Sequence, residues 1–294
     1  MSESLPILDL HSGLPGQGDP EAAKKKLRRL LEILAPLTEE GVLVAFSGGM
    51  DSAFLLWAAR KAREAAGKGR VVALTTTSAS TPNRDRLDAE ALTRDLDIPH
   101  VWRESREMEL PEYARNDRER CYHCKVELFR IAEEVAGKEG LGWVLYGYNA
   151  SDRGDVRPGH RAAEEAGALS PLADADLGKG DIRFLMKEVG LPLSEKPASP
   201  CLSSRIMTGI PVTPERLAHV EAMEEILRKA GASTVRVRVC REDGGSHFFR
   251  VEAGEEDFDT VMACRKELHE AGLAQGYRWV TLDLGGYRTG GGVT

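Results

Sequence analysis

Hydrophobic residues follow two different patterns along the chain, and the change between them indicates two folding units. Between residues 41 and 190, short apolar runs alternate with segments in which apolar residues recur every three or four positions. The runs predict buried strands and the periodic segments predict amphipathic helices. The predicted strands are 41–46, 71–77, 98–104 and 142–148, and the predicted helices are 51–67, 84–96, 121–136 and 179–190. Because strands and helices alternate, we expect an α/β unit with a parallel sheet covered by helices on both faces.

A further helix is expected before the first strand. Leu30 and Leu34 lie on one face of this helix, and Pro36 and Gly41 are expected to end it. In the predicted helix 84–96, Leu87 is expected to face the core. Residues 1–20 lack a basic segment followed by an apolar one, so we expect a flexible leader and not a secretory signal.

After residue 192 the pattern changes to that of a small α+β unit. Pro192, Pro197 and Pro200 mark an extended segment. The residues beyond it predict helices at 215–230 and 255–272 and strands at 235–239, 247–253 and 277–284. We therefore expect a leader (1–20), an α/β domain (21–192), a linker that carries Cys201 (193–212) and a smaller C-terminal α+β domain (213–294).

Composition narrows the functional classes. The 294 residues are 41% hydrophobic and 30% charged, and no run of apolar residues is long enough to span a membrane, so we expect a cytoplasmic protein. The net charge of −7 argues against a nucleic acid partner. Five cysteines, an odd number without an export signal, argue against a disulfide framework and favour thiol chemistry or metal binding.

The strongest local signal is the stretch Ser-Gly-Gly-Met-Asp-Ser at residues 47–52, between the first predicted strand and its helix. Gly48 and Gly49 allow a tight turn, and free N–H groups at a helix start attract an anion. Ser47 and Ser52 add hydroxyl donors, while Asp51 is better suited to Mg²⁺ or to capping the turn. The loop lacks the lysine of a Walker motif. The plainer alternative is an ordinary strand-to-helix turn with an N-cap.

This stretch resembles the signature of the PP-loop ATP pyrophosphatases, the superfamily of NAD synthetase, GMP synthetase and tRNA thiolases. The resemblance implies a PP-loop fold that binds ATP and Mg²⁺ and transfers the adenylyl group to a carbonyl or carboxylate oxygen, with release of pyrophosphate. Members contact adenosine at the end of the second strand, where Thr75 stands. The residues 75–82 depart there from the common Ala-Asp-Ser-Pro-like run of the family.

Three further stretches, residues 120–125, 147–155 and 196–205, closely resemble the LarE-type sulfur transferases. The resemblance implies a nicotinate-derived substrate, pyridinium-3,5-biscarboxylic acid mononucleotide, in nickel-pincer cofactor biosynthesis. In one version of the family the cysteine that matches Cys201 gives up its own sulfur. In the other, three cysteines hold a 4Fe–4S cluster that carries an extra sulfide. Because Cys121 and Cys124 accompany Cys201, the chain matches the cluster version.

Alternatives remain open for the role of the cysteines and for the function of the whole chain. Cys124 has the position of a core residue, and the Cys-x-x-Cys pair also suits a redox couple or half of a zinc site beside His123. Cys240 and Cys264 are expected to be structural. For the whole chain, the alternatives are sacrificial transfer of the Cys201 sulfur, a tRNA thiolase, amide formation as in NAD synthetase, and a nucleotide-binding module without chemistry.

Several charged residues complete the candidate site. Asp152 and Asp155 are expected to bind Mg²⁺ or the ribose, with a surface turn as the alternative. Cys201, Asp51 and Arg205 are expected to act in catalysis, Arg205 on a substrate phosphate.

Three basic residues have no assigned role. Arg236 and Arg238 suit either a phosphate site or a solvated strand face. Lys196 suits either pyrophosphate or an exposed position. The resemblance also implies a homo-oligomer, and the sulfur donor is unknown.

Overall fold

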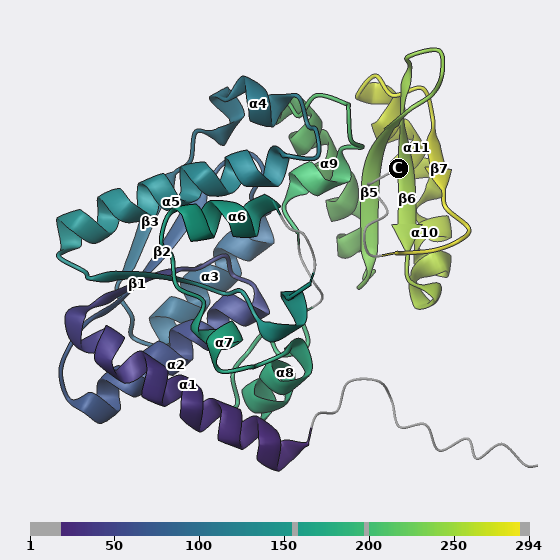
Figure 1. Cartoon of the computed structure of the whole chain (residues 1–294). Coiled ribbons are helices and arrows are strands. Elements are labelled where there is room, and N and C mark those ends of the chain that lie inside the picture. The colour runs from purple at the N-terminus through teal and green to yellow at the C-terminus, as the bar shows by residue number, and fades with distance from the viewer. Residues whose placement is uncertain (1–18, 155–157, 197–199, 289–294) are drawn as a thin grey trace, which may run out of the picture.

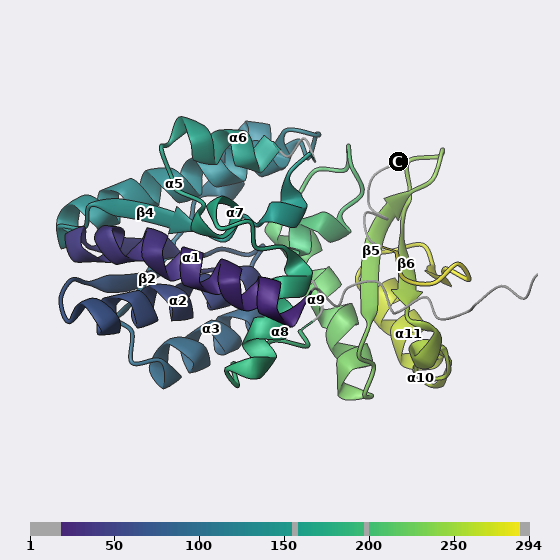
Figure 2. The ribbon, with the colours of Figure 1, turned by 60° about the horizontal axis from the view of Figure 1, so that its bottom comes forward.

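The computed structural model describes residues 19–154, 158–196 and 200–288. Two sheets lie side by side, and α9 lies between them in both views (Figures 1 and 2). The helices are α1 (Pro20–Glu40), α2 (Met50–Ala66), α3 (Asn83–Asp95), α4 (Pro111–Ala114), α5 (Arg120–Glu139), α6 (Pro158–Glu165), α7 (Pro171–Asp174), α8 (Lys179–Glu188), α9 (Pro214–Lys229), α10 (Phe258–Ala263) and α11 (Arg265–Ala274). The strands are β1 (Val42–Ala45), β2 (Val71–Thr77), β3 (His100–Glu104), β4 (Trp143–Tyr146), β5 (Val235–Arg241), β6 (His247–Ala253) and β7 (Val280–Leu282). Short 3₁₀ turns are η1 (Glu107–Glu109), η2 (Ala150–Asp152), η3 (Leu202–Arg205) and η4 (Glu255–Asp257).

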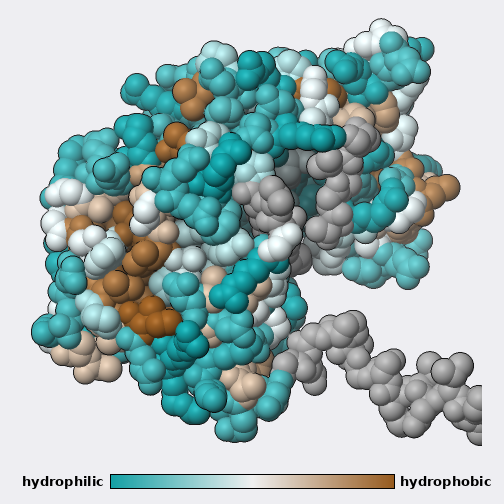
Figure 3. Space-filling view, in the orientation of Figure 1, coloured by the Kyte–Doolittle hydropathy of each residue, from teal (hydrophilic) through white to brown (hydrophobic). Residues whose placement is uncertain are grey.

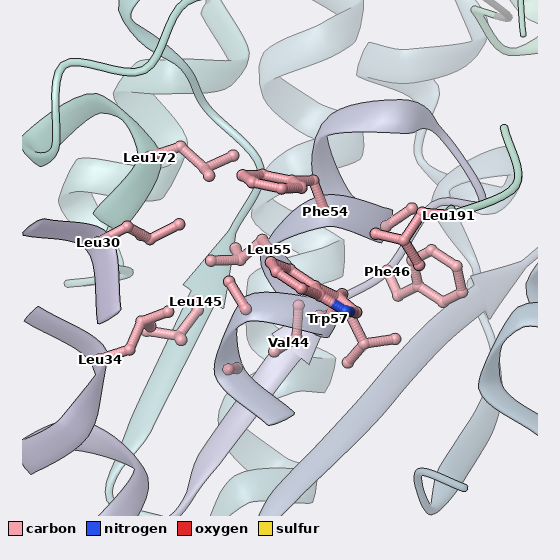
Figure 4. Close-up of a cluster of buried hydrophobic side chains, with 14 of the residues drawn as sticks. Leu30, Leu34, Val44, Phe46, Phe54, Leu55, Trp57, Leu145, Leu172 and Leu191 are labelled. Atoms are coloured by element: carbon pink, nitrogen blue, oxygen red, sulfur yellow. The ribbon is translucent and has the colours of Figure 1, made fainter. Parts of the chain in front are cut away.

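The first sheet is parallel, in the order β3-β2-β1-β4, which confirms the predicted α/β class. Val42 and Val44 of β1 pack with α1, α2 and α8 on one face, whereas Leu43 packs with α5 on the other. All four residues of β1 are buried, as expected for a central parallel strand with helices on both sides. Figure 4 shows the first of these cores, in which side chains of α1, α2, β1 and β4 meet.

Two details of the first unit differ from the predictions. Gly41 is the C-cap of α1, as predicted, and its N–H bonds to the Thr38 carbonyl at 3.1 Å. Pro36 does not end the helix, because Leu37 and Thr38 still pack inward. Leu87 is 67% exposed, and the residues of α3 that face the core are Ala89 and Leu92.

The second sheet has β5 and β6 antiparallel and β7 parallel to β6. Its core combines apolar residues of α9, α11 and all three strands. The predicted helix 255–272 is divided into η4, α10 and α11, and the predicted strand 277–284 forms only over Val280–Leu282. Most of the face seen in Figure 3 is hydrophilic, with a hydrophobic area on the side of the parallel sheet.

The predicted leader lies almost wholly outside the described residues. Of its last two residues, Asp19 caps α1 through the N–H of Glu21, and Pro20 begins the helix, so the leader ends earlier than expected. The other domain boundaries stay predictions. In the part of the chain that the structure describes, no helix is both long enough and apolar enough to cross a membrane.

Candidate functional site

Two serines of the loop between β1 and α2 fix its conformation by hydrogen bonds within the loop. Ser52 Oγ donates to the Gly49 carbonyl at 3.1 Å and accepts from the Ser47 N–H at 3.3 Å. Gly49 is the N-cap of α2 and makes no side-chain cap bond, so no side chain of the cap residue covers the first turn. An N-terminal helix turn of this kind suits an anion.

Two glycines at this loop are required by close backbone contacts. Gly48 has φ +72°, and a Cβ there would lie 2.6 Å from the Asp85 carbonyl oxygen of α3. A Cβ on Gly147, which follows β4, would lie 2.8 Å from the Ser52 nitrogen. The carboxyl end of β4 therefore lies against the start of α2, at the edge of the sheet where open α/β folds bind ligands.

Lys196 also lies at this loop, and its side chain is only 5% exposed, so the expectation of an exposed lysine is wrong. Its Nζ is 2.9 Å from the Gly48 carbonyl oxygen, 2.7 Å from Asp85 and 2.6 Å from Asp88. Together with Asp51, these groups give the loop more carboxylates than ammonium groups. A triphosphate at this loop would therefore need a cation such as Mg²⁺.

Two other predicted nucleotide ligands are buried. Thr75 is 3% exposed, and its hydroxyl bonds to the Phe46 carbonyl at 2.8 Å and to His100 Nε2 at 2.8 Å. Asp152 is 4% exposed and pairs with Lys179 at 3.0 Å. Asp155 lies outside the described residues.

The cysteine pair occupies the first turn of α5. Cys121 is exposed, whereas Cys124 is largely buried and packs against the core of the second unit. Arg120 Nη2 lies 3.9 Å from Cys121 Sγ. Of the two sulfur atoms, that of Cys124 is close enough to Cys201 for their charges to interact.

Cys201 precedes η3, and this turn is bonded to both units. The Leu202 N–H donates to the Ser80 carbonyl beyond the end of β2 at 2.8 Å. Ser203 Oγ lies 2.6 Å from the Tyr113 hydroxyl, and the Ser203 carbonyl accepts from Arg120 Nη1 at 2.8 Å. An isolated parallel bridge joins Ile206 to β5. These contacts place Cys201 between the carboxyl edge of the parallel sheet and the start of α5.

The cysteines affect the pKa values of Cys124 and Arg120. Burial, together with the negative charge of Cys201, raises the pKa of Cys124 to about 12. Burial opposes the charge of Arg120, but Cys201 and Cys121 outweigh it and raise its pKa. Within residues 19–154, 158–196 and 200–288, however, no three histidine, cysteine or acidic side chains lie close enough to hold a metal ion as they stand. Thiolates are ligands that soft metal centres prefer. To bind such a centre here, the cysteine side chains would have to move closer together and Cys124 would have to lose its proton.

Arg205 is 1% exposed and engaged by protein groups. Its Nε and Nη2 donate to Glu224 at 3.0 and 3.3 Å, and its Nη1 donates to the Cys201 carbonyl at 3.1 Å. Burial disfavours a charged Glu224, but Arg205, Arg228 and Arg236 outweigh it and lower the pKa of this carboxyl. Arg205 thus orients the backbone that carries Cys201.

Arg236 and Arg238 are 9% and 5% exposed, so a solvated strand face is wrong. Arg238 pairs with Glu252 at 2.7 Å and donates to the Ser204 carbonyl at 3.0 Å. Arg236 lies over the Tyr287 ring at 5.3 Å. Arg238 therefore helps to fix η3, whereas the contact of Arg236 is with the C-terminal segment.

Sequence reasoning did not single out Asn116, Tyr113 or Glu107. Asn116 and Tyr113 bond to the Cys201 segment, and Glu107 is 2% exposed and accepts from the hydroxyls of Ser78 and Ser80 at 2.5 and 3.2 Å. The serines at 78 and 80 offered a weak signal, because they stand where the family pattern is broken.

Comparison with known proteins places the chain in a family. No protein-family model matches it. It is 33% identical over 250 residues to the pyridinium-3,5-bisthiocarboxylic acid mononucleotide synthase of Lactiplantibacillus plantarum, covering 85% of this chain and 87% of that protein. It is 35% identical to the uncharacterized protein slr1717 of Synechocystis (91% and 96% covered) and 26% identical to the uncharacterized protein MJ0830 of Methanocaldococcus jannaschii (90% and 98% covered). The chain belongs to the family of the pyridinium-3,5-bisthiocarboxylic acid mononucleotide synthase, the LarE-type family that its motifs resemble.

Proposed function

We propose that this protein is an enzyme that uses ATP to replace a carboxylate oxygen of pyridinium-3,5-biscarboxylic acid mononucleotide by sulfur. The observation that carries the proposal is the position of the turn that follows Cys201. Leu202 donates to Ser80 beyond the end of β2, and Ser203 accepts from Arg120 of the helix that bears Cys121 and Cys124. We propose that the loop 47–52 and the three thiols serve one site. The printed name of the bacterial relative, a bisthiocarboxylic acid mononucleotide synthase, supports this substrate class.

In the activation step, a substrate carboxylate oxygen attacks the α-phosphate of ATP, and pyrophosphate leaves. We assign the phosphates to the loop 47–52 and the Mg²⁺ to Asp51. The Ser47 N–H, the Gly49 N–H and the Ser52 hydroxyl bond within the loop in this structure, and a bound phosphate would take over these donors. Thr75 and Asp152 are proposed to shape the nucleoside site from behind, because their side chains are engaged by neighbouring protein groups.

In the second step, sulfur attacks the acyl adenylate and AMP leaves. We propose that Cys121, Cys124 and Cys201 hold a 4Fe–4S cluster. Three protein thiolates on a cubane leave one iron able to carry a transferable sulfide. In this scheme Arg205 and Arg120 keep the Cys201 segment facing the start of α5.

Sacrificial transfer is the second candidate, because Cys201 is also present in that version of the family. Here Cys201 Sγ attacks the acyl adenylate and AMP leaves. A base then removes the Cys201 Cα proton while the Cβ–S bond breaks, which leaves dehydroalanine in the chain and a thiocarboxylate in the product. The protein mass would fall by one hydrogen sulfide in the single turnover that each chain can make.

Two measurements on anaerobically purified protein test the proposal. We expect roughly four irons and four sulfides per chain, lost in a Cys121→Ser/Cys124→Ser variant and kept in Cys264→Ser. We also expect pyrophosphate release that depends on the dicarboxylate substrate. Iron-free protein whose mass falls after one turnover would support the sacrificial route, and an absence of pyrophosphate release would refute both routes.

A further inference from the structure

The two cysteine-bearing segments are joined by Asn116, which lies between α4 and α5 and is fully buried. Its Nδ2 lies 2.8 Å from the Ile210 carbonyl, 2.9 Å from that of Met207 and 3.2 Å from that of Ile206. Since a primary amide has two N–H donors, two carbonyls are bonded well and the third shares a donor. A side chain just before the Cys121 helix thus fixes the backbone just after the Cys201 turn.

The other end of the same amide reaches Arg120. Asn116 Oδ1 accepts from Arg120 Nη1 at 2.5 Å, and this nitrogen also donates to the Ser203 carbonyl at 2.8 Å. The backbone adds a bond from the Gly209 N–H to the Asn116 carbonyl at 3.0 Å. A continuous chain of hydrogen bonds therefore runs from the residue beside Cys121, through Asn116, to Ser203 within η3 and to residues 206–210 after it.

Asparagine is the residue that meets every requirement at this position. Asn116 has φ 58°, in the left-handed region that glycine, asparagine and aspartate tolerate best. Glycine would bring no side chain, and aspartate would bring no N–H donor for the three carbonyls. The left-handed conformation and the need for two donors and one acceptor together select asparagine.

We propose that Asn116, acting through Arg120, is a positioning residue that sets the separation between Cys201 and the pair Cys121 and Cys124. Its catalytic consequence rests on the proposed function, because it would govern the sulfur step and leave adenylate formation intact. The Asn116 side chain bonds to neither the nucleotide loop nor a cysteine, so its effect reaches the sulfur atoms only through the backbone that it fixes.

Asn116→Gly is the sharpest variant, because it removes the amide and keeps the left-handed backbone free of strain. Asp97→Gly is its matched control, since Asp97 is an exposed residue at φ 49° and carries the same gain in chain flexibility. The first readout is bridging of thiols by dibromobimane in the reduced, metal-free full-length chain, with the bridged peptides identified by mass spectrometry. We expect bridges from Cys201 to Cys121 or Cys124 in the wild type and in Asp97→Gly, and about tenfold fewer in Asn116→Gly.

The second readout separates the two half-reactions. In Asn116→Gly we expect pyrophosphate release within about twofold of the wild type and sulfur transfer reduced about 100-fold, the scale of an ångström-sized misplacement. A residue that only supports the fold would lower both rates together. Asn116→Asp keeps the shape and the acceptor for Arg120 but loses the donors, and it should give the same split.

The proposal is overturned if bridging in Asn116→Gly equals that of the wild type, if the wild type forms no bridge to Cys201, or if both half-reactions fall together. Should Asn116→Gly fail to fold, Asn116→Asp decides by the same readouts. The bridging experiment needs no substrate. A wild type that bridges its thiols but releases no pyrophosphate would therefore refute the proposed function and leave the role of Asn116 standing.

Discussion

The buried ion pair of Arg205 and Glu224 gives the most direct test of how the Cys201 turn is held. Glu224→Gln keeps the shape of the side chain and removes its charge, which leaves the guanidinium of Arg205, 1% exposed, without its carboxylate. Two unit charges about 4 Å apart interact by about 4 kcal/mol at an effective dielectric constant of 20. Breaking such a buried pair typically costs about 3–5 kcal/mol. Arg228 is 24% exposed and can turn to water, so it adds little.

We therefore expect Glu224→Gln to lower the free energy of unfolding by about 3–5 kcal/mol, measured by urea denaturation followed by circular dichroism. Glu225→Gln is the matched control. Glu225 is the next residue on α9, it is 48% exposed, and its ion pairs are 3.9 Å long, so its loss should cost less than about 0.5 kcal/mol. Equal effects of the two substitutions, or a loss under about 1 kcal/mol in Glu224→Gln, would refute the reasoning.

Three further predictions concern the nucleotide side of the molecule. Gly48→Ala should abolish ATP binding measured by calorimetry, because its Cβ would meet the Asp85 carbonyl. Gly67→Ala is the control: Gly67 has φ +68° and open space around it, so this variant should bind ATP normally. Equal affinities of the two variants would contradict the prediction. Lys196→Met should weaken ATP binding about tenfold in the same assay, since Asp85 would lose its neutralising partner, and an unchanged affinity would contradict this. Burial lowers the pKa of His100 to about 4, so the folded state holds it neutral, and stability should fall as the pH drops from about 6.5 towards 4. At pH 5 the loss should be about 1 kcal/mol after allowance for partial exposure, and His100→Asn should remove it, as thermal unfolding at pH 7 and 5 will show.

The sequence predicted the elements that depend on local pattern. All four strands of the parallel sheet lie within or coincide with predicted ranges. The signal is clearest for β1, which is buried along its whole length and appears as a continuous apolar run. The errors fall where tertiary contacts outweigh the local signal. Pro36 does not end α1, because packing of the following residues sustains the helix. Leu87 faces water, because α3 turns Asp85 toward Lys196 and so directs its opposite side outward.

The candidate site divides in the same way. The loop 47–52 and the pair Cys121 and Cys124 were predicted from sequence alone, because each motif is a few residues long and the chemistry proposed for it depends on those residues. The sequence did not predict that Lys196, Arg205 and Arg238 are buried in ion pairs. Whether a cation lies in water or beside a buried carboxylate depends on residues far away in the chain.

The sequence by itself determined the α/β pattern and pointed to the glycine-rich loop and to Cys121, Cys124 and Cys201 as the candidate site. Only the tertiary structure decided that Cys201 lies beside α5. The 79 residues between Cys121 and Cys201 carry no local signal of their separation, whereas buried hydrogen bonds join Asn116 and Arg120 to backbone carbonyls of a distant turn. Such bonds leave no periodic pattern in the sequence, because almost any residue can supply a backbone carbonyl.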